Sequence, residues 1–393
     1  MSEPRTTGFS PEGLRRLSDA FARDISAQLI PGAVVMLWRH GETAYLEAMG
    51  VRDPGSGTAM TLDTIFRIYS MTKPITSVAL MMLVEEGRVR LDEPVATYIP
   101  SFGDVRVGIE RDGRLEFVMP LVPMTIHDLM RHTSGITYGF FGEGLVKRSY
   151  LNDGVSEGDY DTAEFAERIA RQPLAYQPGT VWDYSHSTDV LGRIVEIASG
   201  VSLGAFFKRR LFEPLGMVDT AFYLTDAGRI ERLAEPFPDD RVIGTGVEIS
   251  DPRTPHRFEG GGGGLVSTMR DYSRFVRMLL DRGIAGGTRF VSPKTLAFMT
   301  ADHVGPRSGA VPGPMYLPGP GFGFGLGFGV RVEAGGAPYP GSVGEFNWGG
   351  VAGTYFWVDP REDMFAITLI AAPKHRQRYR GLVKNLVYAA MVE

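Results

Sequence analysis

The sequence predicts an α+β fold, in which an antiparallel sheet flanked by helices is combined with an inserted, mostly helical domain. Three observations predict it. Strand patterns stand near both ends of the chain, helical patterns fill the middle, and short links join consecutive strand patterns. Short links suit hairpins and therefore antiparallel pairing. We expect residues 1–90 and 276–393 to build one α/β domain and residues 91–275 the inserted one, with the functional site in the cleft between them.

The N-terminal part of the chain predicts a helix, a hairpin and a second helix. Residues 10–29 carry apolar side chains at helical spacing. Residues 33–51 read as two strands that are joined at a turn containing Gly41. Residues 70–86 have an apolar stripe at helical spacing, and Gly87 is the residue type that commonly follows the last helical turn.

The middle and the C-terminal end of the chain differ in their hydrophobic period. Helical patterns recur at 125–132, 161–172, 187–200, 203–216 and 268–283. Strand patterns return at 321–332, 353–360 and 364–372. The chain closes with a helical pattern from Gln377 to Met391. Strands at both ends therefore enclose helices in the middle, which predicts a sheet built from the two termini.

Composition excludes several classes of function. The 393 residues are 43% apolar and 22% charged, as in a soluble globular protein, and the net charge of −5 argues against a basic surface for nucleic acid. Cysteine is absent, which excludes disulfides, cysteine-ligated zinc and a thiol nucleophile. No apolar segment has the length of a membrane span, and the N-terminus lacks the apolar core of a signal peptide. We therefore expect a cytoplasmic protein.

The stretch "YSMTKP" places Ser70 three residues before Lys73, where polar sequence becomes a helical pattern. Residues three apart share a helix face, so the two side chains are expected to meet. A serine at a helix start also has its backbone N–H near the positive end of the helix dipole. Ser70 is therefore a candidate nucleophile activated by Lys73. The alternative is a helix-capping serine followed by an ordinary lysine.

A second serine competes for the role of nucleophile. "GVSLG" matches the G-x-S-x-G pattern, which needs a strand before the serine and a helix after it. The residues before Gly200 have a helical pattern instead. Gly200 is therefore expected to end one helix, and Ser202 to cap the next.

Two further segments carry candidate site residues. Tyr184, in "WDYSH", is a phenol able to relay a proton, or a half-buried core aromatic. Trp348, Gly349 and Gly350 stand in or before a late strand pattern. Adjacent glycines in a strand indicate that something approaches the backbone closely, as in an oxyanion hole, or that the strand contains a bulge.

Together, "SMTK", "YSH" and "WGG" resemble, in this order, the serine β-lactamase and penicillin-binding protein superfamily. The nearest resemblance is to its esterase branch, the family VIII carboxylesterases. "DTIFRIYSMTKP", "TIHDLMRHTSGI" and "GGGGLVSTMRDYSRF" agree with it, so the resemblance spans about 60 to 360. It implies the β-lactamase/transpeptidase-like fold and a serine hydrolase.

The resemblance implies a role for each matching position. Ser70 corresponds to the acylated nucleophile, Lys73 to the residue that activates it, and Tyr184 to the general base that later protonates the leaving group. The backbone N–H groups of Ser70 and Val351 correspond to the oxyanion hole. Trp348 then lines the substrate pocket.

Departures from the β-lactamase pattern indicate the substrate. His186 stands where β-lactamases of this fold have asparagine, and we expect it to fill space, although a hydrogen bond to substrate or to Tyr184 is the alternative. Trp348 stands where they have the lysine that anchors a carboxylate. The site is therefore expected to take neutral esters with short-to-medium acyl groups. Tyr138 and Phe141 are expected either to wall the cleft or to pack among themselves.

We therefore expect a serine carboxylesterase that acts on small-molecule esters without a cofactor or metal. His127 and His132 are five residues apart, which does not suit a helical metal site, and both are expected to be structural. A β-lactamase, a D-Ala-D-Ala peptidase or an acyltransferase on the same fold is the alternative. A non-catalytic binding protein would be expected to have lost Ser70, Lys73 or Tyr184, and the chain keeps all three.

Overall fold

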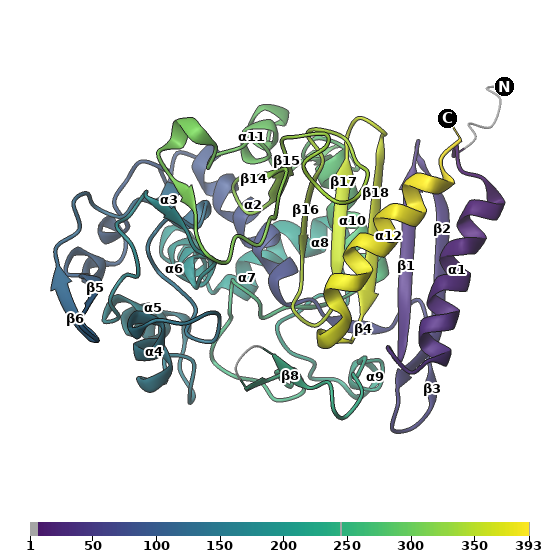
Figure 1. The fold of residues 1–393 in the computed structure, drawn as a ribbon, viewed down its shortest axis with the longest axis horizontal. Helices are drawn as coiled ribbons and strands as arrows, with labels where there is room; N and C mark the ends of the chain where they lie inside the picture. Colours follow the sequence, from purple (N-terminus) through teal and green to yellow (C-terminus); the bar gives the residue numbers. More distant parts are fainter. Residues whose placement is uncertain (1–6, 244–245, 393) are drawn as a thin grey trace.

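Both ends of the chain form one large sheet in the computed structural model, which describes residues 7–243 and 246–392 (Figure 1). Its strand order is β14-β15-β16-β17-β18-β1-β2-β3, and every neighbouring pair is antiparallel. The bounds are β1 Gly32–Arg39, β2 Glu42–Asp53, β3 Thr58–Ala59, β14 Phe322–Phe324, β15 Gly329–Arg331, β16 Phe346–Gly349, β17 Tyr355–Asp359 and β18 Met364–Ile370. The predicted antiparallel sheet is confirmed.

Helices cover both faces of this sheet. Helices α1 (Pro11–Ser26) and α12 (Arg376–Ala390) pack on one face, and α10 (Met269–Leu280) packs on the other. Successive side chains of a strand point to opposite faces of the sheet, which explains the arrangement. Val35 and Leu37 of β1 pack in the core beneath α1 and α12, whereas Val34 and Trp38 pack in the core on the α10 side. Figure 1 shows α1 and α12 side by side, and Phe9, just before α1, pairs with Met391, just after α12.

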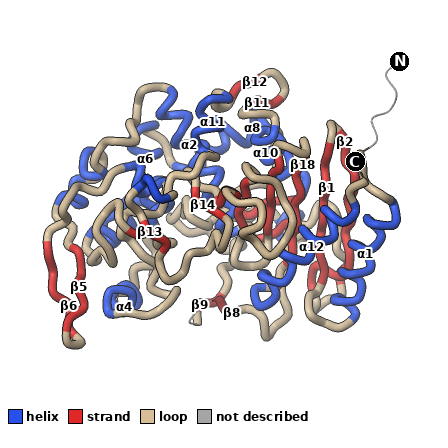
Figure 2. Tube along the Cα trace, turned by 45° about the horizontal axis from the view of Figure 1, so that its top comes forward, coloured by secondary structure: helices blue, strands red, loops and turns tan. Residues whose placement is uncertain are grey.

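The middle of the chain is mainly helical and lies beside the sheet (Figure 2). The remaining helices of the chain are α2 Thr72–Glu85, α3 Ile126–Met130, α4 Leu145–Asn152, α5 Thr162–Ala170, α6 Ser187–Ser199, α7 Leu203–Phe207, a π-helical turn Lys208–Phe212, α8 Glu213–Leu215, α9 Ala227–Ile230 and α11 Pro293–Met299. The expected helices are present. Helix α2 is buried on all sides over its first three turns, which makes it a core helix rather than an amphipathic one.

Short strand pairs connect these helices. They are β4 Ile65–Arg67 with β10 Val266–Thr268, β5 Val107–Arg111 with β6 Arg114–Val118, β7 Val181–Trp182 with β13 Val311–Pro312, β8 Val242–Ile243 with β9 Val247–Glu248, and β11 Ile284–Ala285 with β12 Thr288–Arg289. The β5–β6 hairpin is missing from the sequence-based expectation. The division into two domains stays a prediction, and α10 crosses the expected boundary at residue 276 to pack on the sheet.

Among the described residues, one bent pair of helical segments has the length and apolar composition of a membrane span. No single helix there has both the length and the apolar composition of a span. Ser187–Ser199 and Leu203–Leu215 meet the criteria of length and composition only when taken together, and they bend by 74°.

His127 contacts a second histidine, away from the cavity described below. Its Nε2 lies 3.0 Å from Nδ1 of His303. Burial, followed by the charge of Arg131, lowers the pKa of His127 to about 4. Between pH 6.5 and 4 the unfolded chain therefore binds more protons than the folded chain, so stability falls as the pH falls through this window.

We expect His127→Gln to reduce this acid-induced loss of stability. The predicted change is about 1–2 kcal/mol, because the half-buried ring is partly screened by solvent. Urea unfolding of both proteins at pH 7 and at pH 4.5 measures it. Equal losses of unfolding free energy in the two proteins would contradict the prediction.

Candidate active site

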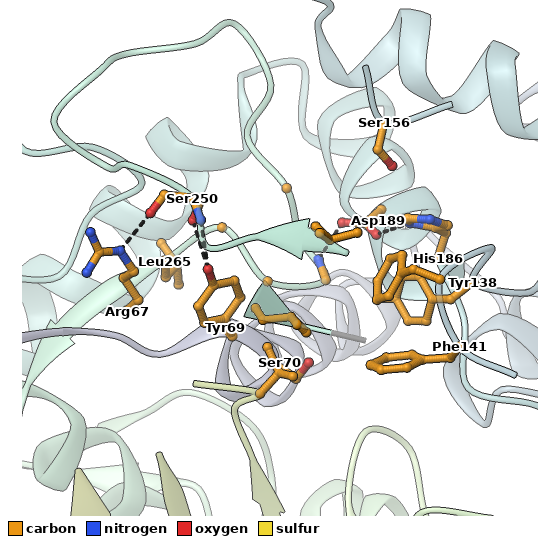
Figure 3. Close-up of a pocket in the computed structure, with 18 of the residues that line it drawn as sticks. Arg67, Tyr69, Ser70, Tyr138, Phe141, Ser156, His186, Asp189, Ser250 and Leu265 are labelled. Atoms are coloured by element: carbon orange, nitrogen blue, oxygen red, sulfur yellow. Dashed lines mark hydrogen bonds and ion pairs between the residues drawn. The ribbon is translucent and has the colours of Figure 1, made fainter. Parts of the chain in front are cut away.

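Ser70 lies in a 3-10 turn, Tyr69–Met71, which links strand β4 to helix α2. The serine is half-buried. The preceding Tyr69 has a φ of +43°, a strained conformation for a bulky residue. Its phenol oxygen accepts hydrogen bonds from the backbone N–H of Ser250 at 2.9 Å and from the Ser250 hydroxyl at 3.3 Å (Figure 3). A strained and anchored residue therefore fixes the backbone beside the candidate nucleophile.

Lys73 is buried, with 1% of its surface exposed, and its ammonium group has three acceptors. Nζ donates to the Gly262 carbonyl at 2.6 Å, to the Tyr138 hydroxyl at 3.0 Å and to Ser70 Oγ at 3.4 Å. An ammonium has three N–H donors, so these acceptors use its full capacity. Nζ also lies 4.5 Å from the centre of the Tyr184 ring. The lysine is thus held between the serine and two tyrosines.

The glycine-rich segment near residue 262 supports this lysine. Gly262 donates its N–H to Asp189 Oδ1 at 2.7 Å, while its carbonyl accepts from Lys73. A β-carbon at Gly262 would lie 2.7 Å from Asp189 Oδ2, so only glycine fits there. The other side of the Asp189 carboxylate contacts Nδ1 of His186 at 3.0 Å (Figure 3). His186 therefore does more than fill space, which corrects the expectation: it orients the carboxylate that holds the Gly262 peptide.

We expect Asp189→Asn to lower kcat on a p-nitrophenyl ester by tenfold or more, because an amide cannot accept from both His186 and Gly262 with equal strength. The position of Lys73 then changes, and the pH profile of kcat should change with it. If Asp189 had only a structural role, Asp189→Asn would lower the melting temperature without changing the pH profile of kcat. Asp24→Asn is the control, since Asp24 is equally buried but pairs with Arg378 on the far side of the sheet.

Tyr184 is buried in an aromatic cluster. Its oxygen accepts a hydrogen bond from Nε1 of Trp348 at 3.2 Å. The His132 ring lies 4.9 Å from the Tyr184 ring, between centres. Burial, followed by the charge of Lys73, lowers the pKa of His132 well below its ordinary value, so that ring is neutral. The imidazole is therefore a packing partner of the phenol rather than a second cation.

Strand β16 brings "WGG" next to the nucleophile, since it packs against the turn that carries Ser70. Each of its two glycines permits a close approach. A β-carbon at Gly349 would lie 2.7 Å from Nη2 of Arg380, and one at Gly350 would clash with the carbonyl of Ile68. The adjacent glycines thus allow the backbone leading to Val351 to lie against the segment before Ser70.

A cavity of about 530 Å³ opens above Ser70, within the usual range for small-molecule sites. Much of its wall is aromatic. The aromatic lining residues are Tyr69, Tyr138, Phe140, Phe141, Tyr160, Phe165, Tyr184, Phe222, Tyr223, Phe258 and Trp348. Figure 3 shows Tyr138 and Phe141 on one side of Ser70 and Tyr69 on the other.

The structure brings the predicted site residues together. Ser70, Tyr138, Phe141, Tyr184, His186, Trp348, Gly349 and Val351 line the cavity. Lys73 and Gly350 are not among the residues that line it. Asp189 and Gly262, which hold Lys73, were missed by the sequence analysis. Within residues 7–243 and 246–392, no group of three or more His, Asp or Glu side chains is arranged to hold a metal ion.

The chain is similar to known proteins over most of its length. The family named Beta-lactamase matches residues 17–387. Protein Rv1367c of Mycobacterium tuberculosis is 37% identical over 353 residues, 88% of this chain and 86% of that protein. Esterase EstB of Burkholderia gladioli is 34% identical over 364 residues, with the same two shares. The solved structure of EstCE1, a hydrolase with promiscuous acyltransferase activity, has a TM-score of 0.82 at 28% identity and covers 96% of this chain and 98% of its own.

The family match covers most of the chain, and both of these relatives exceed 30% identity over most of their length. The resemblance of the sequence to the serine β-lactamase and penicillin-binding protein superfamily is confirmed. The chain belongs to the Beta-lactamase family and is a serine hydrolase.

Proposed function

We propose that this protein is a carboxylesterase that hydrolyses esters with apolar, short-to-medium acyl groups through an acyl-enzyme on Ser70. The observation that carries the proposal is the position of Lys73 Nζ, which contacts Ser70 Oγ and lies over the Tyr184 ring at the base of an aromatic cavity. Aromatic walls suit an apolar acyl chain. The 34% identity with an esterase supports the same reaction class.

The first half of the reaction forms a bond between Ser70 Oγ and the ester carbonyl carbon. The serine proton passes to the Tyr184 phenolate, and the Trp348 N–H and the Lys73 cation face the phenol to support the negative charge before that transfer. The backbone N–H groups of Ser70 and Val351 receive the developing oxyanion. The carbon–oxygen bond to the alcohol then breaks, and Tyr184 returns the proton to the leaving alkoxide.

The second half releases the acyl group to water. Tyr184, again a phenolate, takes a proton from a water molecule while the oxygen of that water attacks the acyl carbon. The bond to Ser70 Oγ breaks, and the same proton restores the serine hydroxyl. Acyl transfer to an alcohol is the second candidate function, because it differs only in what attacks the acyl-enzyme, and EstCE1 has such activity.

Labelling with a p-nitrophenyl phosphonate ester tests the proposal. Intact mass and peptide mapping should place one adduct on Ser70. An adduct on Ser202 would overturn the assignment of the nucleophile. No adduct together with no turnover of p-nitrophenyl butyrate would overturn the proposed esterase. Butyl butyrate formation in aqueous butanol separates acyl transfer from hydrolysis.

A further inference from the structure

A buried lysine of helix α4 contacts the segment that carries Tyr138 and Phe141. The side chain of Lys147 is only 11% exposed. Its Nζ donates a hydrogen bond to the carbonyl of Phe141 at 2.8 Å and lies 3.5 Å from Oδ2 of Asp183. Asp183 is itself buried and directly precedes Tyr184. The ammonium group therefore joins the main chain of the cavity wall to the residue before the proposed general base.

The same carboxylate also holds the beginning of this segment. The hydroxyl of Thr137 donates a hydrogen bond to Asp183 Oδ2 at 2.6 Å. Residues 137–141, which we call the aromatic segment, are thus bound at one end through the Thr137 hydroxyl and at the other through the Phe141 carbonyl. All the aromatic side chains of this segment line the cavity. Lys147 and Asp183 together therefore hold one wall of the cavity.

Helix α4 is the support against which the aromatic segment lies. Gly142 and Gly144 connect the two, with φ of +78° and +129°, which other residues rarely adopt. This turn leaves the Phe141 carbonyl within reach of Lys147. A β-carbon at Gly139 would lie 3.0 Å from two side chains of α4, so the middle of the segment also lies close against the helix.

The polar contacts of Lys147 and Asp183 fix the position of the wall more sharply than ring packing does. The ring of Phe140 lies 4.8 Å from that of Tyr138 and 4.6 Å from that of Phe141, between centres. Such apolar contacts are not directional, whereas hydrogen bonds to charged groups have defined lengths and angles. Because both charges are buried, removal of either partner leaves the other uncompensated and disturbs the whole arrangement.

The aromatic segment is placed to contact the acyl part of the ester. In the proposed function Tyr184 protonates the leaving alcohol, and its oxygen accepts a hydrogen bond from Trp348 of β16. The alcohol therefore leaves beside β16. The aromatic segment belongs to a different part of the chain, and the hydroxyl of Tyr138 accepts from Lys73 instead. Its rings thus border the space that remains for the acyl chain.

We propose that Lys147, together with Asp183, is a positioning residue that fixes the aromatic segment and so sets the selectivity of the enzyme for the length of the acyl chain. Neither residue is among those that line the cavity, so both act through the segment that they hold. This inference rests on the proposed esterase function and adds a determinant of its acyl selectivity.

Two esters with the same leaving group test this role. The chain of p-nitrophenyl hexanoate is long enough to reach the aromatic segment, whereas the methyl group of p-nitrophenyl acetate is not. The ratio of their kcat/KM values, hexanoate over acetate, should fall about tenfold in Lys147→Met, because a displaced wall buries less of the longer chain. The kcat for acetate should change by less than about threefold. Lys147→Arg keeps the charge and should retain part of the selectivity.

Arg148→Met is the matched control, because it removes a positive charge from the next residue of the same helix, where the side chain is exposed and does not line the cavity. Its ratio should equal that of wild type. Thr137→Val tests the other end of the segment, since it removes the hydroxyl that binds Asp183 and leaves Lys147 in place. Its ratio should fall about threefold, which keeps the inference testable if Lys147→Met does not fold.

Other results would overturn the inference. Equal losses on both esters, or a ratio that is unchanged or higher in folded Lys147→Met and Thr137→Val, would remove the positioning role and leave the esterase intact, provided that the phosphonate still labels Ser70. A change seen only between phenyl acetate and 2-naphthyl acetate would place the aromatic segment beside the alcohol. Loss of all ester turnover in wild type, together with no phosphonate adduct, would remove the esterase itself.

Discussion

Replacing Ser70 with alanine should abolish ester turnover while the protein stays folded. The expected loss in kcat is about 10⁴-fold or more, as when the nucleophile of other serine hydrolases is removed. The fold should survive because the hydroxyl is half-buried and its hydrogen bond comes from Lys73, which keeps two other acceptors. Steady-state hydrolysis of p-nitrophenyl butyrate and thermal unfolding by circular dichroism measure the two effects.

Ser202→Ala is the matched control. In the structure Ser202 caps helix α7, with its side chain accepting from the N–H of Ala205, and Gly200 ends helix α6 in a left-handed conformation. Replacing Ser202 with alanine should cost about 1 kcal/mol of stability and keep most of the activity. Full activity in Ser70→Ala, or collapse of catalysis in a folded Ser202→Ala protein, would contradict the assignment of the nucleophile.

The spacing of apolar residues along the sequence was sufficient to predict the sheet and most helices. In β1 the alternation of Val34 and Val35 between two cores follows directly from the pleat of a strand. The β5–β6 hairpin was missed although its signal was present. Asp112 and Gly113 form its turn with φ of 51° and 74°, and Asp-Gly is a common pair at such turns.

The candidate site residues stand in short motifs that the sequence displays, whereas the residues that support Lys73 do not. The hydrogen bond from Lys73 to Gly262 joins residues 189 positions apart, and that from Gly262 to Asp189 spans 73. No local pattern encodes such contacts, because they depend on how α2, α6 and the glycine-rich segment pack.

His186 shows how a departure from a family pattern acquires meaning only in the fold. From sequence it was a substituted position with no evident partner. In the structure its ring contacts Asp189 and lies 4.2 Å from the Tyr138 ring, between centres, so one residue touches both the support of Lys73 and the cavity wall.

The two tyrosines beside Lys73 permit a test of which phenol transfers the proton. Burial raises the pKa of Tyr138 well above its ordinary value, and the charges of Asp189 and Tyr184 raise it further, so that phenol stays protonated and cannot act as a base. It accepts a hydrogen bond from Lys73 at 3.0 Å, which indicates a positioning role. Tyr184 instead faces the Lys73 cation with its ring and accepts from Trp348.

We therefore expect Tyr184→Phe to lower kcat by about 10²–10⁴-fold, the usual contribution of a general acid–base group, with little change in the melting temperature. Tyr138→Phe removes the same atom type from the same cluster and should lower kcat by about tenfold or less, because Lys73 loses one of three acceptors. The Tyr184→Phe protein should also react more slowly with the phosphonate, since activation of Ser70 is lost. The reverse order, with Tyr138→Phe inactive and Tyr184→Phe nearly unchanged, would assign proton transfer to Tyr138 instead.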